Sequence, residues 1–205
     1  EQVHFKEELI RRTGQRIIVE KDTNMAVLGE YYFGRQRGCS DLLYITVSTG
    51  IGGGIICSGE VYRGHLGGAG EFGHMVVEAG GAICNCGRSG CLEALASGSA
   101  VDKRLGQMVE QGQGQGILNC ANPGERPGPR ELGIAVRQGD EEARLLLSQV
   151  TRYLGIGIAN LVNILNPRAI ILGGGMMLGL KDLLLEPVRN YVYEHVFSLN
   201  REDLI

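Results

Sequence analysis

Residues 154–175 read LGIGIANLVNILNPRAIILGGG and contain the pattern that decides the fold class. Apolar side chains repeat at intervals of three and four over residues 147–165, which predicts a long buried helix that Pro167 ends. Residues 168–172 form a short apolar run typical of a strand, and the glycines at 173–175 predict a tight turn. A second helix is expected over residues 183–196. Helix, strand, glycine turn and helix in this order indicate a layered α/β fold.

Two more strands are expected upstream, on either side of a glycine-rich loop. Residues 41–48 are rich in the β-branched and aromatic side chains that favour strands. The sequence STGIGGG at 48–54 would break this strand and lead to a second one at 54–57, followed by a hairpin turn at 58–60. Residues 64–91 are too rich in glycine for long elements, so we expect them to build a site from loops.

The first part of the chain predicts two helices and a strand. Residues 3–12 place apolar side chains against charged neighbours, and Gly14 follows where a helix often ends. Residues 16–20 (RIIVE) are typical of a short buried strand, and Asp22 can cap a helix that carries residues 25–29. Asp22 is therefore expected at a turn from strand to helix.

Composition limits the classes of function. The chain has 205 residues, 43% of them hydrophobic, and a formal net charge of −3, which suits a globular protein with a sizeable core. No run of Lys and Arg offers a nucleic-acid surface, and no apolar run approaches the about 20 residues of a membrane span. The start lacks a charged and then apolar leader, so we expect a cytoplasmic location. The low-complexity residues 112–129 are expected to form a flexible surface loop.

Three of the six cysteines lie in CNCGRSGC at residues 84–91, with His74 ten residues upstream of the first. One imidazole and three thiolates suit a tetrahedral zinc ion. The glycines between the cysteines would let the backbone fold back, so that Cys91 reaches a metal already held by Cys84 and Cys86. Four protein ligands leave no position for an activated water, so a structural zinc is expected. The alternative is a set of three free thiols.

Two glutamates flank the cysteine motif. Glu71 lies three residues before His74, and Glu93 lies two residues after Cys91. Zinc binding would bring both carboxylates to one place and would hold the second ring nitrogen of His74 in a fixed orientation. Carboxylates accept hydrogen bonds in pairs, which suits the vicinal hydroxyls of a sugar. Each glutamate alone would be a solvated surface charge, but together they are candidates for contacts with a hydroxyl-rich ligand.

Asp22 and the glycine segments each allow two interpretations. Asp22 could be a helix cap, or it could be a base that removes a proton from a ligand hydroxyl. The loop at 48–54 could donate N–H groups to a nucleotide phosphate, with a hydroxyl from Ser48 or Thr49, or it could be part of a plain hairpin. The glycines at 173–175 could equally be only a tight turn.

Taken in order, five segments resemble the ROK family of repressors, uncharacterised reading frames and sugar kinases: VEKDTNMAVLGE, ITVSTGIGGGII, GEFGHM, CNCGRSGCLEALAS and NILNPRAIILGGG. The resemblance runs from about residue 5 to residue 196 and includes a stretch similar to the family signature, GEVYRGHLGGAGEFGH. It implies the two-lobed actin-like (ribonuclease H-like) ATPase fold. Residues 1–40 would be the tail of the N-terminal lobe and the hinge, and residues 41–205 the C-terminal lobe, with a zinc loop at 74–91 and the flexible loop at 112–129.

By this resemblance the chain would phosphorylate a sugar with ATP and magnesium. Asp22 would be the catalytic base that deprotonates the accepting hydroxyl. The residues implied as sugar contacts are Lys21, Glu71, His74 and Glu93. The residues implied for ATP are Thr49, Gly50, Gly52 and Gly53 at the phosphates and Gly173, Gly174 and Gly175 at the adenosine. The structural zinc would be held by His74, Cys84, Cys86 and Cys91. A homodimer or higher homo-oligomer is also implied.

The sequence departs from the family pattern in three places. The family usually has Asn immediately before the catalytic Asp, where this chain has Lys21, a donor that cannot accept a hydrogen bond. The family's first phosphate loop, Asp-x-Gly-Gly-Thr, and its glycine- and alanine-rich final helix are both missing, so we expect a fragment that cannot turn over alone.

A glucokinase-like kinase that transfers phosphate from ATP to a hexose is the leading hypothesis. The rival is a sugar-responsive repressor that uses the same pocket for an inducer and reads DNA with a separate helix-turn-helix. A purely structural zinc module would leave the glycine loop and the clustered carboxylates unexplained.

Overall fold

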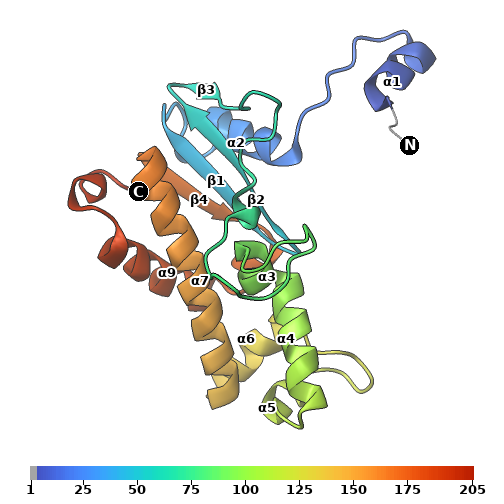
Figure 1. The fold of residues 1–205 in the computed structure, drawn as a ribbon, viewed down its shortest axis with the longest axis vertical. Helices are drawn as coiled ribbons and strands as arrows, with labels where there is room; N and C mark the ends of the chain where they lie inside the picture. The colour runs from blue at the N-terminus through green and yellow to red at the C-terminus, as the bar shows by residue number, and fades with distance from the viewer. Residues whose placement is uncertain (1–3) are drawn as a thin grey trace.

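The computed structural model describes residues 4–205, and a four-stranded sheet lies at its centre (Figure 1). The strand order is β3-β2-β1-β4. β1 (Leu42–Val47) pairs antiparallel with β2 (Ile51–Cys57) and parallel with β4 (Ala169–Gly173). β3 (Glu60–Val61) pairs antiparallel with β2. Val3, part of the first predicted helix, lies outside the described residues.

Strand β1 is buried on both faces because its side chains alternate between two cores. Leu43 and Ile45 belong to the large core that most of the helices share. Leu42 belongs to a smaller core with Val27 of α2 (Asp22–Phe33). Helix α2 therefore packs on one face of the sheet, and the helices that contribute to the large core lie on the opposite face. This arrangement confirms the predicted layered α/β class.

The large core lies between the sheet and helices from the second half of the chain (Figure 1). Helix α7 (Glu141–Leu165) begins after Asp140, whose carboxylate accepts a hydrogen bond of 2.7 Å from the Ala143 N–H. Helix α9 (Lys181–His195) packs along α7, where the missing side chain of Gly155 leaves room for Tyr191. The remaining helices are α3 (Leu92–Ala96), α4 (Gly98–Glu110), α5 (Gln115–Leu118), α6 (Pro129–Gln138), α8 (Gly175–Gly179), η1 (Phe72–His74) and η2 (Ser198–Arg201).

Helix α7 is also the one described helix that is long and apolar enough to cross a membrane by length and composition. However, 56% of its most apolar window is buried inside the protein. Its inward residues, including Leu154 and Ile158, belong to the large core. The helix predicted at 147–165 is thus confirmed as a core helix, with an additional turn at its start.

The strand predicted at residues 16–20 is wrong. These residues are extended but pair with no described strand, and the Ile18 side chain is 75% exposed. Helix α1 (Phe5–Thr13) ends at Gly14 as predicted, yet it buries no side chain and stands away from the sheet (Figure 1). The apolar pattern is present, but a strand needs a partner for its backbone groups, and the described part of the chain offers none here.

The flexible loop predicted at 112–129 contains a folded portion. Helix α5 lies near its start, and the Ile117 side chain is fully buried in the large core. The Gly114 N–H also donates a hydrogen bond of 2.9 Å to Glu142 Oε2 on α7. The loop expectation is wrong for residues 114–118, because one apolar side chain anchors an otherwise polar stretch.

Candidate metal centre and active site

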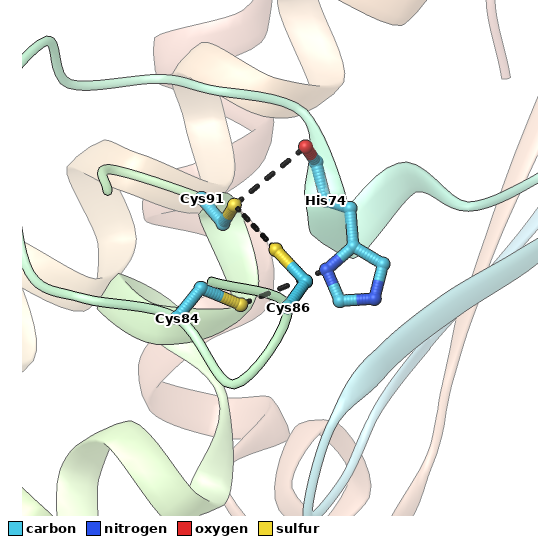
Figure 2. Close-up of side chains that lie close together, drawn as sticks. All are labelled: His74, Cys84, Cys86 and Cys91. Carbon is cyan, nitrogen blue, oxygen red and sulfur yellow. Dashed lines mark hydrogen bonds between the residues drawn. The ribbon is translucent and has the colours of Figure 1, made fainter. Parts of the chain in front are cut away.

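The cysteine motif folds back on itself between η1 and α3. An isolated β-bridge pairs Val76 with Cys91, which returns the chain to the point where the loop began. Gly90 has a φ of 77°, and a Cβ at this position would collide with the Glu78 carbonyl oxygen. Glycine is therefore required for the return. Figure 2 shows the result, a cluster of four side chains from His74, Cys84, Cys86 and Cys91.

The four donor atoms of this cluster all lie within 4.8 Å of one another. Cys84 Sγ is 3.6 Å from His74 Nδ1, and Cys86 Sγ is 3.6 Å from Cys91 Sγ. Two sulfurs of a tetrahedral zinc site, each about 2.3 Å from the metal, are about 3.8 Å apart, whereas a disulfide needs about 2.0 Å. The residues therefore fit a zinc ion.

The environment of the thiols differs across the cluster. Hydrogen bonds from the backbone and side chain of Arg88 lower the pKa of Cys86 to about 6. Burial is the main cause that raises the pKa of Cys91 to about 11. The thiolate form is therefore favoured at Cys86 and disfavoured at Cys91 unless a cation compensates its charge. A divalent metal would supply that compensation, because thiols bind metals as thiolates.

His74 directs its two ring nitrogens to opposite sides. Nδ1 faces the cysteine sulfurs, and Nε2 points away from them (Figure 2). The His74 backbone N–H donates a hydrogen bond of 3.1 Å to the Glu71 carbonyl, so both residues belong to one tight turn at η1. With a metal on Nδ1, the proton of the ring resides on Nε2 and can be donated to a ligand.

Lys21 and Glu71 form an ion pair that sequence reasoning did not foresee. Lys21 Nζ donates to Glu71 Oε1 at 2.7 Å and to the Ala69 carbonyl at 3.2 Å. The Lys21 side chain is largely buried, whereas that of Glu71 is half exposed. The two segments that contribute Asp22 and His74 are thereby linked directly across a sequence separation of 50 residues.

Glu93 lies in the first turn of α3 and faces the start of β2. Its Oε2 accepts a hydrogen bond of 2.9 Å from the Ile51 N–H. A Cβ at Gly50 would lie 2.5 Å from the same oxygen, so only glycine admits the carboxylate this closely. Glu93 therefore supports the turn before β2, and its Oε1 is the oxygen left for a ligand.

Asp22 is the first residue of α2, and Lys21, not Asp22, occupies the cap position. The Asp22 carboxylate is exposed and accepts a hydrogen bond of 2.8 Å from the N–H of Thr23. A carboxylate at this position is stabilised by the positive end of the helix dipole. The structure thus places an accessible carboxylate next to the Lys21–Glu71 ion pair.

The glycine loop predicted at 48–54 is wrong in its extent, because β2 already begins at Ile51. Gly52 and Gly53 lie inside this strand. A Cβ at Gly53 would collide with the ring of Phe72, and one at Gly54 would lie 2.5 Å from the Thr23 carbonyl oxygen. These glycines therefore let η1 and α2 approach the sheet closely. Only residues 48–50 form a turn.

The turn at 48–50 is held by the start of α4. The Gly98 N–H donates to the Ser48 carbonyl at 2.7 Å, and the Ser99 N–H donates to the Thr49 carbonyl at 3.1 Å. A cavity of about 210 Å³ lies beside the turn. Thr49 and Gly50 line it together with Cys84, Glu93 and Lys103. Lys103 was not singled out from the sequence, because a lone lysine on an exposed helix carries no motif.

The second glycine turn lies next to the first. Gly173 ends β4, and Gly174, with a φ of 94°, leads into α8. A Cβ at Gly174 would lie 2.5 Å from the Val47 carbonyl, and one at Gly175 would lie 3.6 Å from Ser48 Oγ. Both turns therefore lie at the carboxyl ends of the parallel strands β1 and β4, where ligands of α/β proteins commonly bind.

One further contact joins the cysteine loop to the core. The Tyr153 hydroxyl on α7 donates a hydrogen bond of 2.7 Å to Glu78 Oε1 in the loop, and this contact raises the pKa of Tyr153. No signal in the sequence points to this pair, since 75 residues separate its members.

Comparisons with known proteins agree with this architecture. A glucokinase of Thermotoga maritima is 36% identical over 194 residues, which are 95% of this chain and 61% of the relative. A putative xylose repressor of a Caldicellulosiruptor species is also 36% identical, over 95% of this chain and 48% of the relative. The chain thus spans about half to three fifths of the length of these relatives.

A solved structure shares the fold. The ROK family glucokinase from Streptomyces griseus, in complex with glucose and AMPPNP, matches with a TM-score of 0.78 and 34% identity, over 94% of this chain and 62% of that one. This likeness confirms the predicted actin-like ATPase fold class. The profile of the ROK family matches residues 1–205. The chain therefore belongs to the ROK family.

Proposed function

We propose that the protein phosphorylates a hexose or related sugar with ATP, and that this chain carries the sugar pocket and part of the nucleotide site. The observation that carries the proposal is the Lys21–Glu71 ion pair, which joins the segment of the exposed Asp22 to the turn of Glu71 and His74, together with the close approach of that turn to Ile51, the residue after the glycine turn at 48–50. Glucokinases at 36–38% identity over most of the chain support the same reaction.

In this proposal Asp22 is the general base. Its carboxylate removes the proton of the accepting hydroxyl as that oxygen attacks the γ-phosphate, a role typically worth 10²- to 10⁴-fold in rate. Glu71 Oε2, Glu93 Oε1 and the Nε2–H of His74 are the remaining groups that can hold the other hydroxyls. A sugar has both donors and acceptors, and this set provides both.

The glycine turns serve the nucleotide. Thr49 and Gly50 offer a hydroxyl and a backbone N–H to the phosphates, and Gly173, Gly174 and Gly175 border the adenosine. Gly52 and Gly53 act indirectly, because they let neighbouring elements pack against β2. Magnesium bound with ATP neutralises the charge that develops during transfer.

The zinc is proposed to be structural. His74, Cys84, Cys86 and Cys91 would fill all four positions of the metal, so no position is left to activate a water. The ion would fix the turn that carries His74, and through it the orientation of Nε2.

A sugar-responsive repressor is the second candidate. The putative xylose repressor is 36% identical over 95% of this chain, so a relative with another role is as similar in sequence as the glucokinase of Thermotoga maritima. In such a protein the sugar would be an inducer, and an attached helix-turn-helix would bind DNA. The family resemblance also leads us to propose a homodimer or higher homo-oligomer for either function.

A phosphorylation assay on the full natural protein separates the two candidates. Glucose, fructose, mannose and N-acetylated hexosamines are offered with ATP and magnesium, and release of ADP is followed. We expect turnover on at least one sugar, and we expect Asp22→Asn to abolish turnover while sugar affinity stays within a few fold. Sugar binding without turnover on any of them would refute the kinase and favour the repressor.

A further inference from the structure

The segment that leads into Asp22 is held by side-chain contacts and not by a sheet. Residues 16–20 are extended and pair with no described strand, so no ladder of backbone hydrogen bonds fixes them. The Ile18 side chain is 75% exposed and that of Val19 is 54% exposed, so packing holds them only weakly. The place at which this segment delivers Asp22 to the site therefore depends on the contacts of the residues next to it.

Glu20 binds the chain on both sides of Asp22. Its Oε1 accepts a hydrogen bond of 3.0 Å from the Lys21 backbone N–H and one of 2.8 Å from Asn24 Nδ2. Lys21 immediately precedes Asp22, and Asn24 follows it by two residues. Asn24 is only 2% exposed, so water competes little for its bond. One carboxylate oxygen thus fixes the geometry of the turn that carries Asp22.

The second oxygen of Glu20 is held by Arg63. Oε2 accepts a hydrogen bond of 2.8 Å from Arg63 Nε and lies 2.7 Å from Nη2. Arg63 follows β3 by two residues, and the Tyr62 N–H between them donates to the Ile55 carbonyl of β2 at 2.9 Å. Arg63 therefore extends from backbone that the sheet holds in place. The bond from Asn24, and to a smaller degree Arg63, lowers the pKa of Glu20, so the network contains a charged carboxylate at neutral pH.

From this network we propose that Glu20 and Arg63 are positioning residues that hold Asp22 in place for catalysis. The inference rests on the proposed function, because it treats Asp22 as the general base. A general base must lie within hydrogen-bond reach of the hydroxyl that it deprotonates, and a misplacement of about 1 Å can lower the rate about 100-fold. Neither residue has to contact the sugar in this role. Their loss should therefore lower kcat and leave the binding of the sugar intact.

Steady-state kinetics on the full natural protein tests the proposal. The first variant is Arg63→Met, which removes the guanidinium and keeps most of the stem; the side chain is 51% exposed, so we expect the variant to fold. Arg137→Met is the matched control. The Arg137 side chain is 43% exposed and holds Asp182 through the same two nitrogens, Nε at 2.9 Å and Nη2 at 2.7 Å. This second pair joins α6 to α9, which carry no proposed site residue.

We expect Arg63→Met to lower kcat by about 10- to 100-fold, while the KM for the sugar stays within about threefold. Arg63→Lys keeps the charge and should recover part of the loss. Glu20→Gln should also lower kcat. The double variant Glu20→Gln/Arg63→Met should be no slower than the slower single variant, because members of one network do not act additively. Arg137→Met should keep the kcat of the wild type, even if its Tm falls.

Hydrogen exchange followed by mass spectrometry provides a readout that needs no turnover. Peptides that cover residues 20–24 should exchange faster in Arg63→Met than in the wild type and in Arg137→Met, because the anchor of this segment is lost. Unchanged kcat in both Glu20→Gln and Arg63→Met would overturn the inference. A rise in the sugar KM as large as the fall in kcat would also overturn it, since the two residues would then support the sugar pocket as a whole.

Failure of the proposed function is recognised separately. Turnover by the wild type with no change in the variants refutes only the positioning role. Absence of turnover by the wild type on every sugar refutes the kinase, and this inference with it, even if exchange at residues 20–24 still rises in Arg63→Met.

Discussion

The substitution Gly54→Ala tests whether the close approach of α2 to β2 positions Asp22. A Cβ at Gly54 would lie 2.5 Å from the Thr23 carbonyl oxygen and 2.7 Å from Val27 Cγ1, whereas ordinary contacts begin at 3.4 Å. Restoring 3.4 Å from 2.5 Å requires α2 to move by about 0.9 Å. Neither neighbour can rotate away, because one is backbone and the other is a fully buried β-branched side chain.

The expected cost of Gly54→Ala follows from this displacement. Overpacking of a core position costs about 1–3 kcal/mol. For a chain of this size each kcal/mol corresponds to about 2–4 °C, so the Tm should fall by about 2–12 °C. A displacement near 1 Å at a catalytic group can also lower kcat by about 100-fold, and Asp22 lies in the turn that must move.

Gly29→Ala is the matched control in the same helix. No atom lies within 4 Å of a Cβ at Gly29, so alanine should stabilise the helix by about 0.5–1 kcal/mol and raise the Tm slightly. Thermal unfolding followed by circular dichroism measures both variants, and steady-state kinetics on the full natural protein measures kcat. Equal Tm values for the two variants would refute the packing argument, and a lower Tm with unchanged kcat would refute the link to Asp22.

Two further predictions concern the metal and acid stability. Cys86→Ser should reduce the zinc content, which atomic absorption measures and which should be about one ion per chain in the wild type. The same variant should bind sugar more weakly. Full zinc content with normal sugar binding would contradict the metal assignment. The pKa of Glu20 is lowered, mainly by the hydrogen bond from Asn24 and also by Arg63. The unfolded chain therefore binds more protons at Glu20 than the folded chain does. The stabilisation from the Glu20 carboxylate is fully present above its pKa in the unfolded chain, and it is lost as the pH falls through its lower pKa in the folded chain. Between pH 6 and pH 3, the free energy of unfolding measured with urea should fall less for Glu20→Gln than for the wild type. An equal dependence of this free energy on pH in the two proteins would contradict the prediction.

The sequence predicted those features whose cause is local. The helix at 147–165, the strand before residue 173 and the clustering of His74 with Cys84, Cys86 and Cys91 all follow from spacing and residue type, because periodicity and ligand chemistry act over short stretches. The cluster needed no long-range information beyond the reach of one loop. The layered α/β class followed from the order of these elements.

Features that depend on distant partners were misread. RIIVE has the composition of a strand but pairs with none of the strands in residues 4–205, so Ile18 is exposed. The glycine loop was expected to reach residue 54, yet β2 begins at Ile51, and the glycines inside this strand make room for Thr23 and Phe72, which lie elsewhere in the sequence. The Lys21–Glu71 ion pair joins residues 50 apart, and no periodicity encodes such a pair.

Glu93 connects the proposed metal centre to the turn at residues 48–50, which lies outside the proposed sugar contacts. Cys91 is a proposed zinc ligand, Glu93 follows two residues later in the first turn of α3, and its Oε2 holds the Ile51 N–H at 2.9 Å, just after the turn at 48–50. A short, rigid chain of contacts therefore connects the cysteines to the turn proposed for the ATP phosphates. In the proposed enzyme, loss of the metal would free the start of α3, and the support that Glu93 gives to the turn would weaken with it. A structural ion placed in this way would order the proposed sugar side through His74 and the proposed nucleotide side through Glu93, so we expect the binding of both substrates to depend on a metal that contacts neither.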